Sequence, residues 1–252
     1  MEMGYRELAK YYSLLFPLND RQRGFFEHLL HDGPANSVVD VGCGTGEHLS
    51  WFSARHFRSY GLEPNADMFQ ELQHRRWPGP PPTLVPRGAD ALPGTVGESV
   101  DLVLCLGNTL PHLLDRAAVL RAVRGMTEAL SPRGRIVLQT VNFDRVLDER
   151  RATFPVIERI LPDGGGRIAF FREYDWDALP GRLLFKTRLE TPVGERQAAW
   201  PLLPLRREEV VHCVGEAGLF DIQVLGDYDR SPFSGTSPAL IVVGERRLPP
   251  PR

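Results

Sequence analysis

The sequence is poor in cysteine, with three among 252 residues, at Cys43, Cys105 and Cys213. An odd number of widely spaced cysteines does not suit a disulfide framework, so we expect reduced thiols. The chain shows neither the basic and apolar regions of a signal peptide nor an apolar run long enough to cross a bilayer. These absences predict a cytoplasmic protein with no membrane partner.

An excess of positive charge is missing too, because the formal net charge is −2 at pH 7. This balance does not favour nucleic acid or an anionic membrane as a partner. The Lys-Asp or Asp-Asp-Asn constellation of a divalent-metal site is not evident, so no metal is expected. An apolar fraction of 42% suffices for a sizeable core. The length suits one large domain, or a domain with an elaborated second half.

The most informative stretch is 38–48, which reads Val-Val-Asp-Val-Gly-Cys-Gly-Thr-Gly-Glu-His. An apolar, β-branched run stops at glycines spaced one residue apart, and a run with helical character follows. Gly42 and Gly44 allow a tight turn and bring backbone N–H groups close to a ligand. The start of the next helix adds a partial positive charge. The stretch therefore predicts a site for a ligand with an anionic or polar end, laid across the top of a strand.

Strands alternate with helices through residue 141, which predicts an open parallel sheet. The expected strands are Ser37–Val41, Phe57–Glu63, Thr83–Pro86, Val100–Leu106 and Arg135–Val141. The expected helices between them are Glu47–His56, Asn65–Arg75 and Asp115–Leu130. Two late strands, Phe220–Leu225 and Ala239–Gly244, return to this sheet. The fold class is α/β, Rossmann-like and doubly wound, with a mostly parallel seven-stranded sheet.

The pattern changes near Asp144, where short strands alternate with glycine and proline turns. The expected strands are Val156–Leu161, Arg167–Asp175, Arg182–Thr191 and Glu195–Leu203. They predict an antiparallel β insert in the C-terminal half, placed to build a substrate pocket. The expected division is a helical lid at 1–36, a binding domain at 37–143 and 204–246, a substrate cap at 144–203 and a disordered tail at 247–252.

Several polar features stand at strand ends on one edge of the predicted sheet. They are the glycine turn, Glu63, Asp90 and the segment Leu106–Asn108. Ligands of such sheets bind outside the carboxyl ends of the strands, where the strand order reverses. Glu63 comes about twenty residues after the first glycine, the spacing at which nucleotide-binding units place an acid on the ribose hydroxyls. These features predict one crevice beside the first strand.

The chain resembles the class I S-adenosylmethionine-dependent methyltransferases. The resemblance rests on the Asp-Val-Gly-Cys-Gly-Thr-Gly string, on Glu63, on Gly-Ala-Asp-Ala-Leu at 88–92 and on Leu-Ser-Pro-Arg-Gly-Arg at 130–135. It implies S-adenosylmethionine as cofactor and S-adenosylhomocysteine as product. It also implies a glycine loop fixed by Asp40 under the methionyl part, Glu63 on the ribose and Asp90 on the adenine amino group. The expected cofactor-binding residues are Asp40, Gly42, Cys43, Gly44, Gly46, His48, Glu63, Pro64, Met68, Asp90, Ala91, Leu106 and Gly107.

A nicotinamide or flavin dinucleotide enzyme is the main alternative with the same architecture. Its Gly-x-Gly-x-x-Gly/Ala fingerprint needs a small residue where this chain has Glu47. A pyrophosphate there would face an extra carboxylate. S-adenosylmethionine carries no phosphate and bears a sulfonium cation, so acidic neighbours favour the methyltransferase interpretation.

A narrower resemblance is to the glycine/sarcosine N-methyltransferase group. Residues 105–113, Cys-Leu-Gly-Asn-Thr-Leu-Pro-His-Leu, are similar to that group's Cys-Leu-Gly-Asn-Ser-Phe-Ala-His-Leu segment. The similarity implies that the Leu106 carbonyl accepts from the cofactor amino group, that His112 contacts the methionyl end and that Asn108 faces substrate. The group holds the substrate carboxylate with an arginine where this chain has Val141. Glycine is therefore not the expected acceptor, and a larger, less anionic molecule is.

Tyr12, Asn108 and His112 are the expected catalytic residues. Tyr12 either packs the first helix or, as part of a lid, reaches the reactive group. Methyl transfer is an in-line displacement that depends mostly on alignment, and a neutral amine needs no strong base. We therefore expect a methyltransferase for a small molecule, monomeric or homodimeric, with nitrogen favoured over oxygen. The alternatives are a non-catalytic S-adenosylmethionine-binding module and a methyltransferase for protein or RNA.

The predicted insert carries a set of aromatic residues with two open interpretations. Most simply they form its packed face, and alternatively some of them form a substrate wall. The set is Phe170, Phe171, Tyr174, Trp176 and Trp200.

Overall fold

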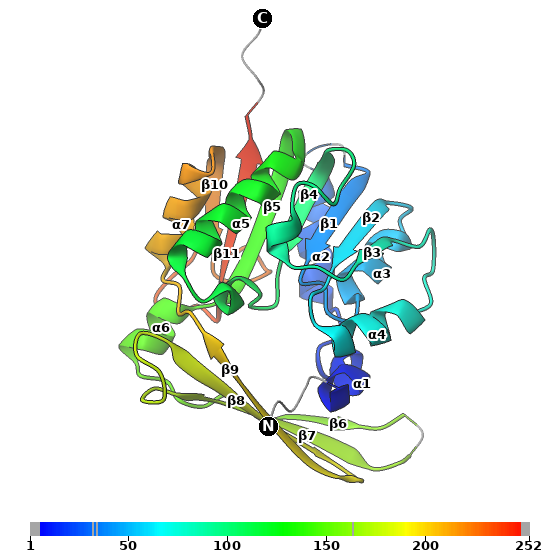
Figure 1. The fold of residues 1–252 in the computed structure, drawn as a ribbon, viewed down its shortest axis with the longest axis vertical. Coiled ribbons are helices and arrows are strands. Elements are labelled where there is room, and N and C mark those ends of the chain that lie inside the picture. The colour runs from blue at the N-terminus through cyan, green and yellow to red at the C-terminus, as the bar shows by residue number, and fades with distance from the viewer. Residues whose placement is uncertain (1–5, 32, 34, 163, 248–252) are drawn as a thin grey trace, which may run out of the picture.

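A seven-stranded sheet and a four-stranded sheet form two layers of the molecule (Figure 1). The computed structural model describes residues 6–31, 33, 35–162 and 164–247. The larger sheet has the order β10-β11-β5-β4-β1-β2-β3, and only β11 runs antiparallel to its neighbours. Its strands are β1 (Ser37–Val41), β2 (Arg58–Leu62), β3 (Thr83–Val85), β4 (Val100–Cys105), β5 (Leu130–Val141), β10 (Leu219–Leu225) and β11 (Ala239–Arg246). The predicted α/β class with a mostly parallel seven-stranded sheet is confirmed.

Strand β1 lies at the centre of this sheet and is buried along its whole length. β4 pairs with it on one side and β2 on the other, so the strand order reverses at β1. Its apolar, β-branched residues suit a strand that is covered on both faces. The reversal leaves a crevice at the carboxyl end of β1, because the chain leaves β1 and β4 toward opposite faces.

Helices cover both faces of the seven-stranded sheet. α5 (Arg116–Ala129) and α7 (Arg207–Glu216) pack on one face, in the larger hydrophobic core. α2 (Asp20–His31) and α3 (Glu47–Ser53) pack on the other, where Phe26 and Phe52 are fully buried. The other helices are α1 (Arg6–Leu15), α4 (Ala66–His74), α6 (Phe143–Asp148) and the short 3₁₀ turns η1 (Ala89–Ala91) and η2 (Leu110–Leu113). None of the helices among the described residues has the length and apolar character that a membrane crossing requires.

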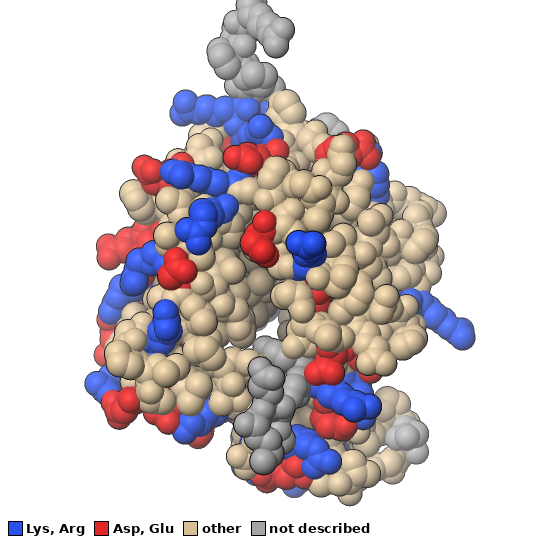
Figure 2. All heavy atoms as spheres, viewed as in Figure 1, with Lys and Arg blue, Asp and Glu red and all other residues tan. Residues whose placement is uncertain are grey.

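The insert is the antiparallel sheet that the turns predict, with order β6-β7-β8-β9. Its strands are β6 (Ile157–Ile160), β7 (Arg167–Asp175), β8 (Leu183–Thr191) and β9 (Gly194–Leu202). It lies below the carboxyl ends of the central strands, and α1 lies between the two layers (Figure 1). The face in Figure 2 is hollowed between these layers, and its acidic and basic side chains are interspersed.

The structure adds helix α6, which the sequence did not predict. Asn142 begins it, because its side chain accepts a hydrogen bond from the Arg145 N–H at 3.2 Å. The Asn142 amide group also donates to the Ser237 carbonyl at 3.0 Å. Asn142 is therefore a buried structural cap. The ends of the expected lid and tail, residues 1–5 and 248–252, lie outside the described residues.

Candidate active site

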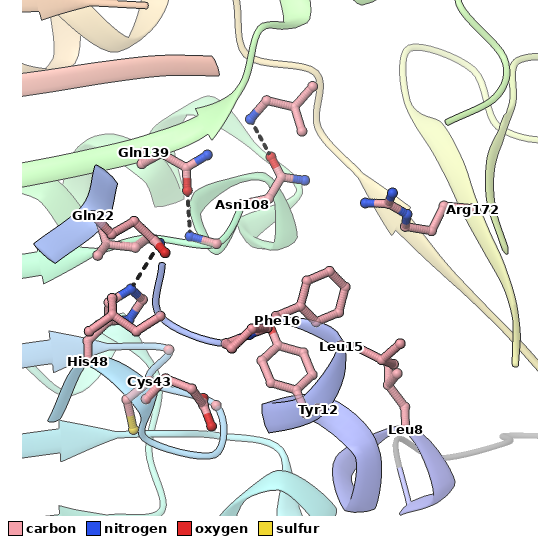
Figure 3. Close-up of a pocket in the computed structure, with 18 of the residues that line it drawn as sticks. Leu8, Tyr12, Leu15, Phe16, Gln22, Cys43, His48, Asn108, Gln139 and Arg172 are labelled. Atoms are coloured by element: carbon pink, nitrogen blue, oxygen red, sulfur yellow. Dashed lines mark hydrogen bonds between the residues drawn. The ribbon is translucent and has the colours of Figure 1, made fainter. Parts of the chain in front are cut away.

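A cavity of about 520 Å³ opens at the carboxyl end of β1. Its walls come from the glycine turn, α1, the loop after β4 and the end of β5, and its floor is the antiparallel sheet. Tyr12, Cys43, His48, Asn108 and Arg172 reach it from different elements (Figure 3). The volume falls in the usual range for small-molecule sites. A cavity therefore lies at the predicted edge of the sheet and extends from the glycine turn to the insert, although Glu63 and Asp90 do not line it.

The glycine turn is shaped by two close approaches. Gly42 has a φ of 72°, and a Cβ on it would lie 2.5 Å from the Thr109 side chain. Gly44 has a φ of 57°, and a Cβ on it would lie 3.4 Å from the Tyr12 ring. Side chains are disfavoured at such angles, so both positions need glycine. Gly44 thus brings bare backbone to the cavity wall directly beneath α1.

Carboxylates gather around the glycine turn, where Asp40 lines the cavity and Glu63, outside the lining, bonds to the turn itself. Asp40 is buried, its Oδ2 has no hydrogen-bond partner, and the nearest basic atom is His48 Nδ1 at 3.6 Å. Glu63 accepts backbone N–H groups from Gly44 and Asn65, each at 2.8 Å, and burial raises its pKa. Buried carboxylates without cationic partners are costly, so this end suits a ligand that brings positive charge.

Tyr12 stays a neutral phenol in this surrounding. Burial raises its pKa, and so do the charges of Glu47, Glu63 and Asp40. Its ring covers Gly44 and stacks at a tilt on Phe16, with ring centroids 4.9 Å apart. Tyr12 therefore forms a wall of the cavity with its hydroxyl protonated, which fits packing and positioning better than proton abstraction.

Glu47 explains the departure from the dinucleotide pattern. Its buried carboxylate accepts from Thr45 Oγ1 at 2.8 Å, from the Ser13 hydroxyl, and from Arg75 Nη1 at 2.8 Å. Ser13 lies on α1 and Arg75 at the end of α4. Glu47 therefore joins three elements around the glycine turn, a task that a small residue cannot perform.

The other end of α1 is held by the insert. Arg159 on β6 donates from Nε to the Leu14 carbonyl at 3.1 Å and from Nη2 to the Leu15 carbonyl at 3.4 Å. A cation at free helix carbonyls is favourable because of the helix dipole. α1 is thus bonded both to the glycine turn and to the antiparallel sheet, across the mouth of the cavity.

Asn108 stands in the loop after β4 with a left-handed backbone, at a φ of 68°. Its Oδ1 accepts the Val141 N–H at 3.2 Å, so the amide NH₂ is the end that remains for the cavity (Figure 3). Beside it, Gln139 Oε1 accepts the Gly107 N–H at 2.8 Å. These two bonds hold the Asn108 side chain so that its NH₂ group can donate a hydrogen bond to a ligand oxygen in the cavity.

His112 lies on η2 and also lines the cavity. Its ring is open to the cavity itself, but the surrounding protein desolvates it and lowers its pKa. The ring is therefore neutral near pH 7 and can accept a proton. Its predicted contact with the methionyl end stays a prediction.

The Leu106 carbonyl is less available than the resemblance implies. It accepts from Thr109 Oγ1 at 2.7 Å and from the Thr109 N–H at 3.3 Å. A carbonyl oxygen has two lone pairs, so both are in use. A cofactor amino group would have to displace the Thr109 hydroxyl, and this role also stays a prediction.

Six of the predicted cofactor residues lie away from the cavity lining: Gly46, Glu63, Pro64, Met68, Asp90 and Ala91. Gly46 caps α3, and Met68 is buried in α4 behind its Asn65 cap. Asp90 is exposed on η1, and Ala91 is half-buried beside it. A Cβ on Gly88 would lie 3.0 Å from Asp90 Oδ1 and 3.8 Å from Pro64 Cβ. The segment that follows β2 and the segment that follows β3 therefore lie next to each other, on the side of the glycine turn that faces away from the cavity.

Sequence reasoning missed several side chains that line the cavity, among them Gln22, Gln139, Arg159, Arg172 and Tyr228. Of the predicted aromatic set, Phe170, Tyr174 and Trp200 line the cavity, whereas Phe171 and Trp176 do not. A signal existed for Arg172. It shares one face of β7 with residues 170 and 174, because side chains alternate along a strand.

Two further kinds of chemistry, metal binding and nucleophilic attack by a thiol, depend on how the described side chains are arranged. The part of the chain that the structure describes contains no group of three His, Cys, Asp or Glu side chains arranged to hold a metal ion. Cys43 and Cys105 are buried, and burial raises the pKa of both thiols. Thiols are weak nucleophiles when protonated, so both act as small apolar residues.

Comparison with known proteins places this geometry in context. Residues 38–134 match the family model described as a methyltransferase domain. A dTDP-4-amino-2,3,4,6-tetradeoxy-D-glucose N,N-dimethyltransferase from Saccharopolyspora spinosa is 33% identical over 115 residues, which are 45% of this chain and 44% of that protein. The chain spans about half the length of the curated relatives it matches.

Solved structures match over nearly the whole chain. An S-adenosylmethionine-dependent methyltransferase from Clostridium acetobutylicum ATCC 824 has a TM-score of 0.76 at 11% identity, covering 97% of this chain and 99% of that one. The S-adenosylmethionine-bound amino pentose methyltransferase CalS10 from Micromonospora echinaspora has a TM-score of 0.70 at 24% identity, covering 95% and 96%. The chain thus has the fold of class I S-adenosylmethionine-dependent methyltransferases. The narrower likeness to the glycine/sarcosine group is not shown by these comparisons.

Proposed function

We propose that this chain transfers a methyl group from S-adenosylmethionine to an amine nitrogen of a small molecule, with an amino sugar as the favoured acceptor. The observation that carries the proposal is one continuous cavity that joins the acidic glycine turn to Asn108 and to the aromatic rings of the insert. Two of the proteins named above, the Saccharopolyspora spinosa enzyme and CalS10, act on amino sugars, as their names state. Their activity supports the acceptor class for this chain.

The glycine-turn end of the cavity fits the cofactor. Asp40 offers a buried carboxylate oxygen without a partner, which suits the ammonium group of a methionyl chain. A Cβ on Gly44 would already touch the Tyr12 ring at 3.4 Å, so a larger side chain there would fill the slot between them. When bound, S-adenosylmethionine supplies an activated methyl group on a sulfonium. The described residues supply a cradle that is acidic, tight and covered by α1.

The acceptor end of the cavity favours nitrogen. The Asn108 NH₂ group orients an acceptor oxygen, and His112 is only a weak base because desolvation lowers its pKa. Burial also raises the pKa of Tyr174, which therefore stays protonated and gives no base. An amine attacks once its lone pair is free, whereas a hydroxyl usually needs a stronger base nearby. Catalysis then depends on alignment and the exclusion of water.

We assign α1 to the lid of this site and the sheet β6–β9 to its cap. Arg159 and Glu47 bond α1 to both sides of the cavity mouth. Opening of the site then requires the exchange of these polar bonds and the separation of Leu15 from the apolar cluster that it forms with Ile168, Phe170 and Leu189. Glu63, Pro64, Asp90 and Ala91 are assigned to the adenosine end, because Pro64 and Asp90 meet at Gly88 and Glu63 bonds to the glycine turn beside them.

The test is turnover with matched acceptors. The purified chain is incubated with S-adenosylmethionine and pairs of sugars that differ only in carrying an amino or a hydroxyl group. Methylated product and S-adenosylhomocysteine are measured by mass spectrometry. We expect methylation of amino members alone. Methylation of hydroxyl members alone would contradict the nitrogen preference. Binding of NAD without binding of S-adenosylhomocysteine would contradict the function as a whole.

A further inference from the structure

The cavity has two poles of opposite charge. Asp40 and Glu47 lie at the glycine turn, while Arg159 and Arg172 enter from strands β6 and β7 of the insert. Glu47 is paired with Arg75, and the donors of Arg159 go to the carbonyls of α1 and of Glu158. Arg172 is the second arginine of the cavity lining. Whether its N–H donors are occupied therefore decides whether the insert can bind an anion.

Arg172 makes few bonds for a half-buried guanidinium. Its Nη2 donates to the Pro155 carbonyl at 3.0 Å, while its enclosed Nε has no hydrogen-bond partner. No carboxylate among the described residues forms an ion pair with it. A guanidinium has five N–H donors, so most of its capacity is unused. A desolvated charge without a counter-ion is costly, which indicates that the counter-ion comes with a ligand.

The position of Arg172 is well defined. Its guanidinium carbon lies 5.3 Å from the Phe154 ring centroid and 6.0 Å from that of Phe170, so two rings hold it. The side chain points across the cavity toward Asn108 (Figure 3). Burial lowers its pKa, yet an arginine remains charged at neutral pH. A fixed cation therefore faces the end of the cavity that is distant from the glycine turn.

An apolar wall of three aromatic rings on the insert lines the same cavity as Arg172. Tyr174 shares the face of β7 with Arg172, and the register pairs it with Phe185, which in turn pairs with Trp200. The ring centroids of Tyr174 and Phe185 are 5.6 Å apart, and those of Phe185 and Trp200 are 6.3 Å apart. A ring of an acceptor can lie on this wall with one end near Asn108 and the other near Arg172.

We propose that Arg172 binds an oxyanion, a phosphate or a carboxylate, which the methyl acceptor carries at the end remote from its amine. This inference rests on the proposed function, since it concerns the acceptor half of the same cavity. The sequence alone predicts a less anionic acceptor, because Val141 stands where the glycine/sarcosine group has an arginine. An anion bound by Arg172 replaces that expectation. Val141 does line the cavity, but the insert brings a cation from a different element.

The test compares charged and uncharged probes on the full chain saturated with S-adenosylhomocysteine. Thymidine 5′-diphosphate against thymidine measures the preference for phosphate, and glucosaminuronate against glucosamine measures the preference for carboxylate. Calorimetry gives the dissociation constants for the wild type, Arg172→Met and Arg172→Lys. We expect one charged probe to bind on the order of 10- to 100-fold more tightly than its uncharged counterpart. Arg172→Met should abolish that difference, and Arg172→Lys should keep part of it.

Arg167→Met is the matched control. Arg167 lies on the same strand, is exposed, and pairs with Glu158 at 2.7 Å outside the cavity lining. This variant should keep the wild-type preference for the charged probe. An unchanged preference in Arg172→Met, or no preference in the wild type, would overturn the inference. Failure of the wild type to bind S-adenosylhomocysteine would instead refute the proposed function, so the two failures are distinguishable.

Discussion

Glu63 accepts the backbone N–H of Gly44 at 2.8 Å and so joins the end of β2 to the glycine turn. The predicted ribose-binding acid and the predicted cofactor loop are therefore directly bonded. Glu63 accepts the Asn65 N–H as well, which begins the α4 turn. One buried carboxylate thus orders two loops that the proposed cofactor must contact.

The first prediction concerns Glu63→Gln. In this variant the glutamine NH₂ would face a backbone N–H, so either the Gly44 or the Asn65 N–H would lose its hydrogen-bond acceptor. The ribose hydroxyls of the cofactor would also lose a charged acceptor. We expect the dissociation constant for S-adenosylhomocysteine, measured by calorimetry, to rise on the order of 10- to 100-fold. Glu98→Gln is the control, because Glu98 is exposed and pairs with Arg58. An unchanged constant in Glu63→Gln would remove Glu63 from the cofactor site.

The second prediction concerns Gly44→Val. A valine there meets the Tyr12 ring and adopts a left-handed backbone, which costs about 1–2 kcal/mol. We expect loss of S-adenosylhomocysteine binding in a protein that still melts cooperatively. Gly97→Ala should bind normally, since a Cβ on Gly97 has no neighbour within 4 Å. A folded Gly44→Val variant with wild-type affinity would show that the slot beside Tyr12 is not part of the site.

The third prediction concerns Asn108→Ala. It removes the NH₂ donor at the acceptor side and the acceptor for the Val141 N–H. We expect kcat/KM for the methyl acceptor to fall on the order of 10- to 100-fold, with cofactor affinity within about 3-fold of the wild type. Asn108→Gly is the control for backbone strain, because it removes the same side-chain amide and glycine tolerates the φ of 68°. It should share the loss of turnover. Equal losses in turnover and cofactor affinity would assign Asn108 to the cofactor.

The fourth prediction concerns the pH dependence of stability. Burial lowers the pKa of His112 in the folded state below its unfolded value of about 6.5. The unfolded state therefore binds the proton first, and stability falls as pH drops from about 6.5 through the folded pKa. We expect His112→Gln to lose less stability than the wild type between about pH 7 and about pH 5. Urea unfolding midpoints measure this difference.

The exposed His74 provides the control for that experiment. His74→Gln should follow the wild-type pH profile. A His112→Gln profile that also follows the wild type would mean that protonation of His112 does not limit stability in acid. It would leave the position of His112 on the cavity wall unchanged.

The elements of the fold followed from local patterns. The glycine turn, the alternation of strands and helices and the four strands of the insert were predicted to within a few residues of their observed bounds, except that β5 begins at Leu130. These features depend on side-chain periodicity and on backbone preferences of glycine and proline, which act between near neighbours. Helix α6 was missed because six residues carry too little periodic signal.

Tertiary structure decided how the insert and α1 meet the sheet. Arg159 contacts carbonyls 144 and 145 residues earlier in the chain, and Glu47 reaches Ser13 across 34 residues. Sequence spacing carries no information on such contacts, because packing of separate layers sets them. By itself the sequence determined the glycine turn at the end of β1, because one strand and its turn suffice to specify it. The other half of the cavity, with Arg172 opposite Asn108, exists only because the antiparallel sheet folds over the carboxyl ends of the central strands.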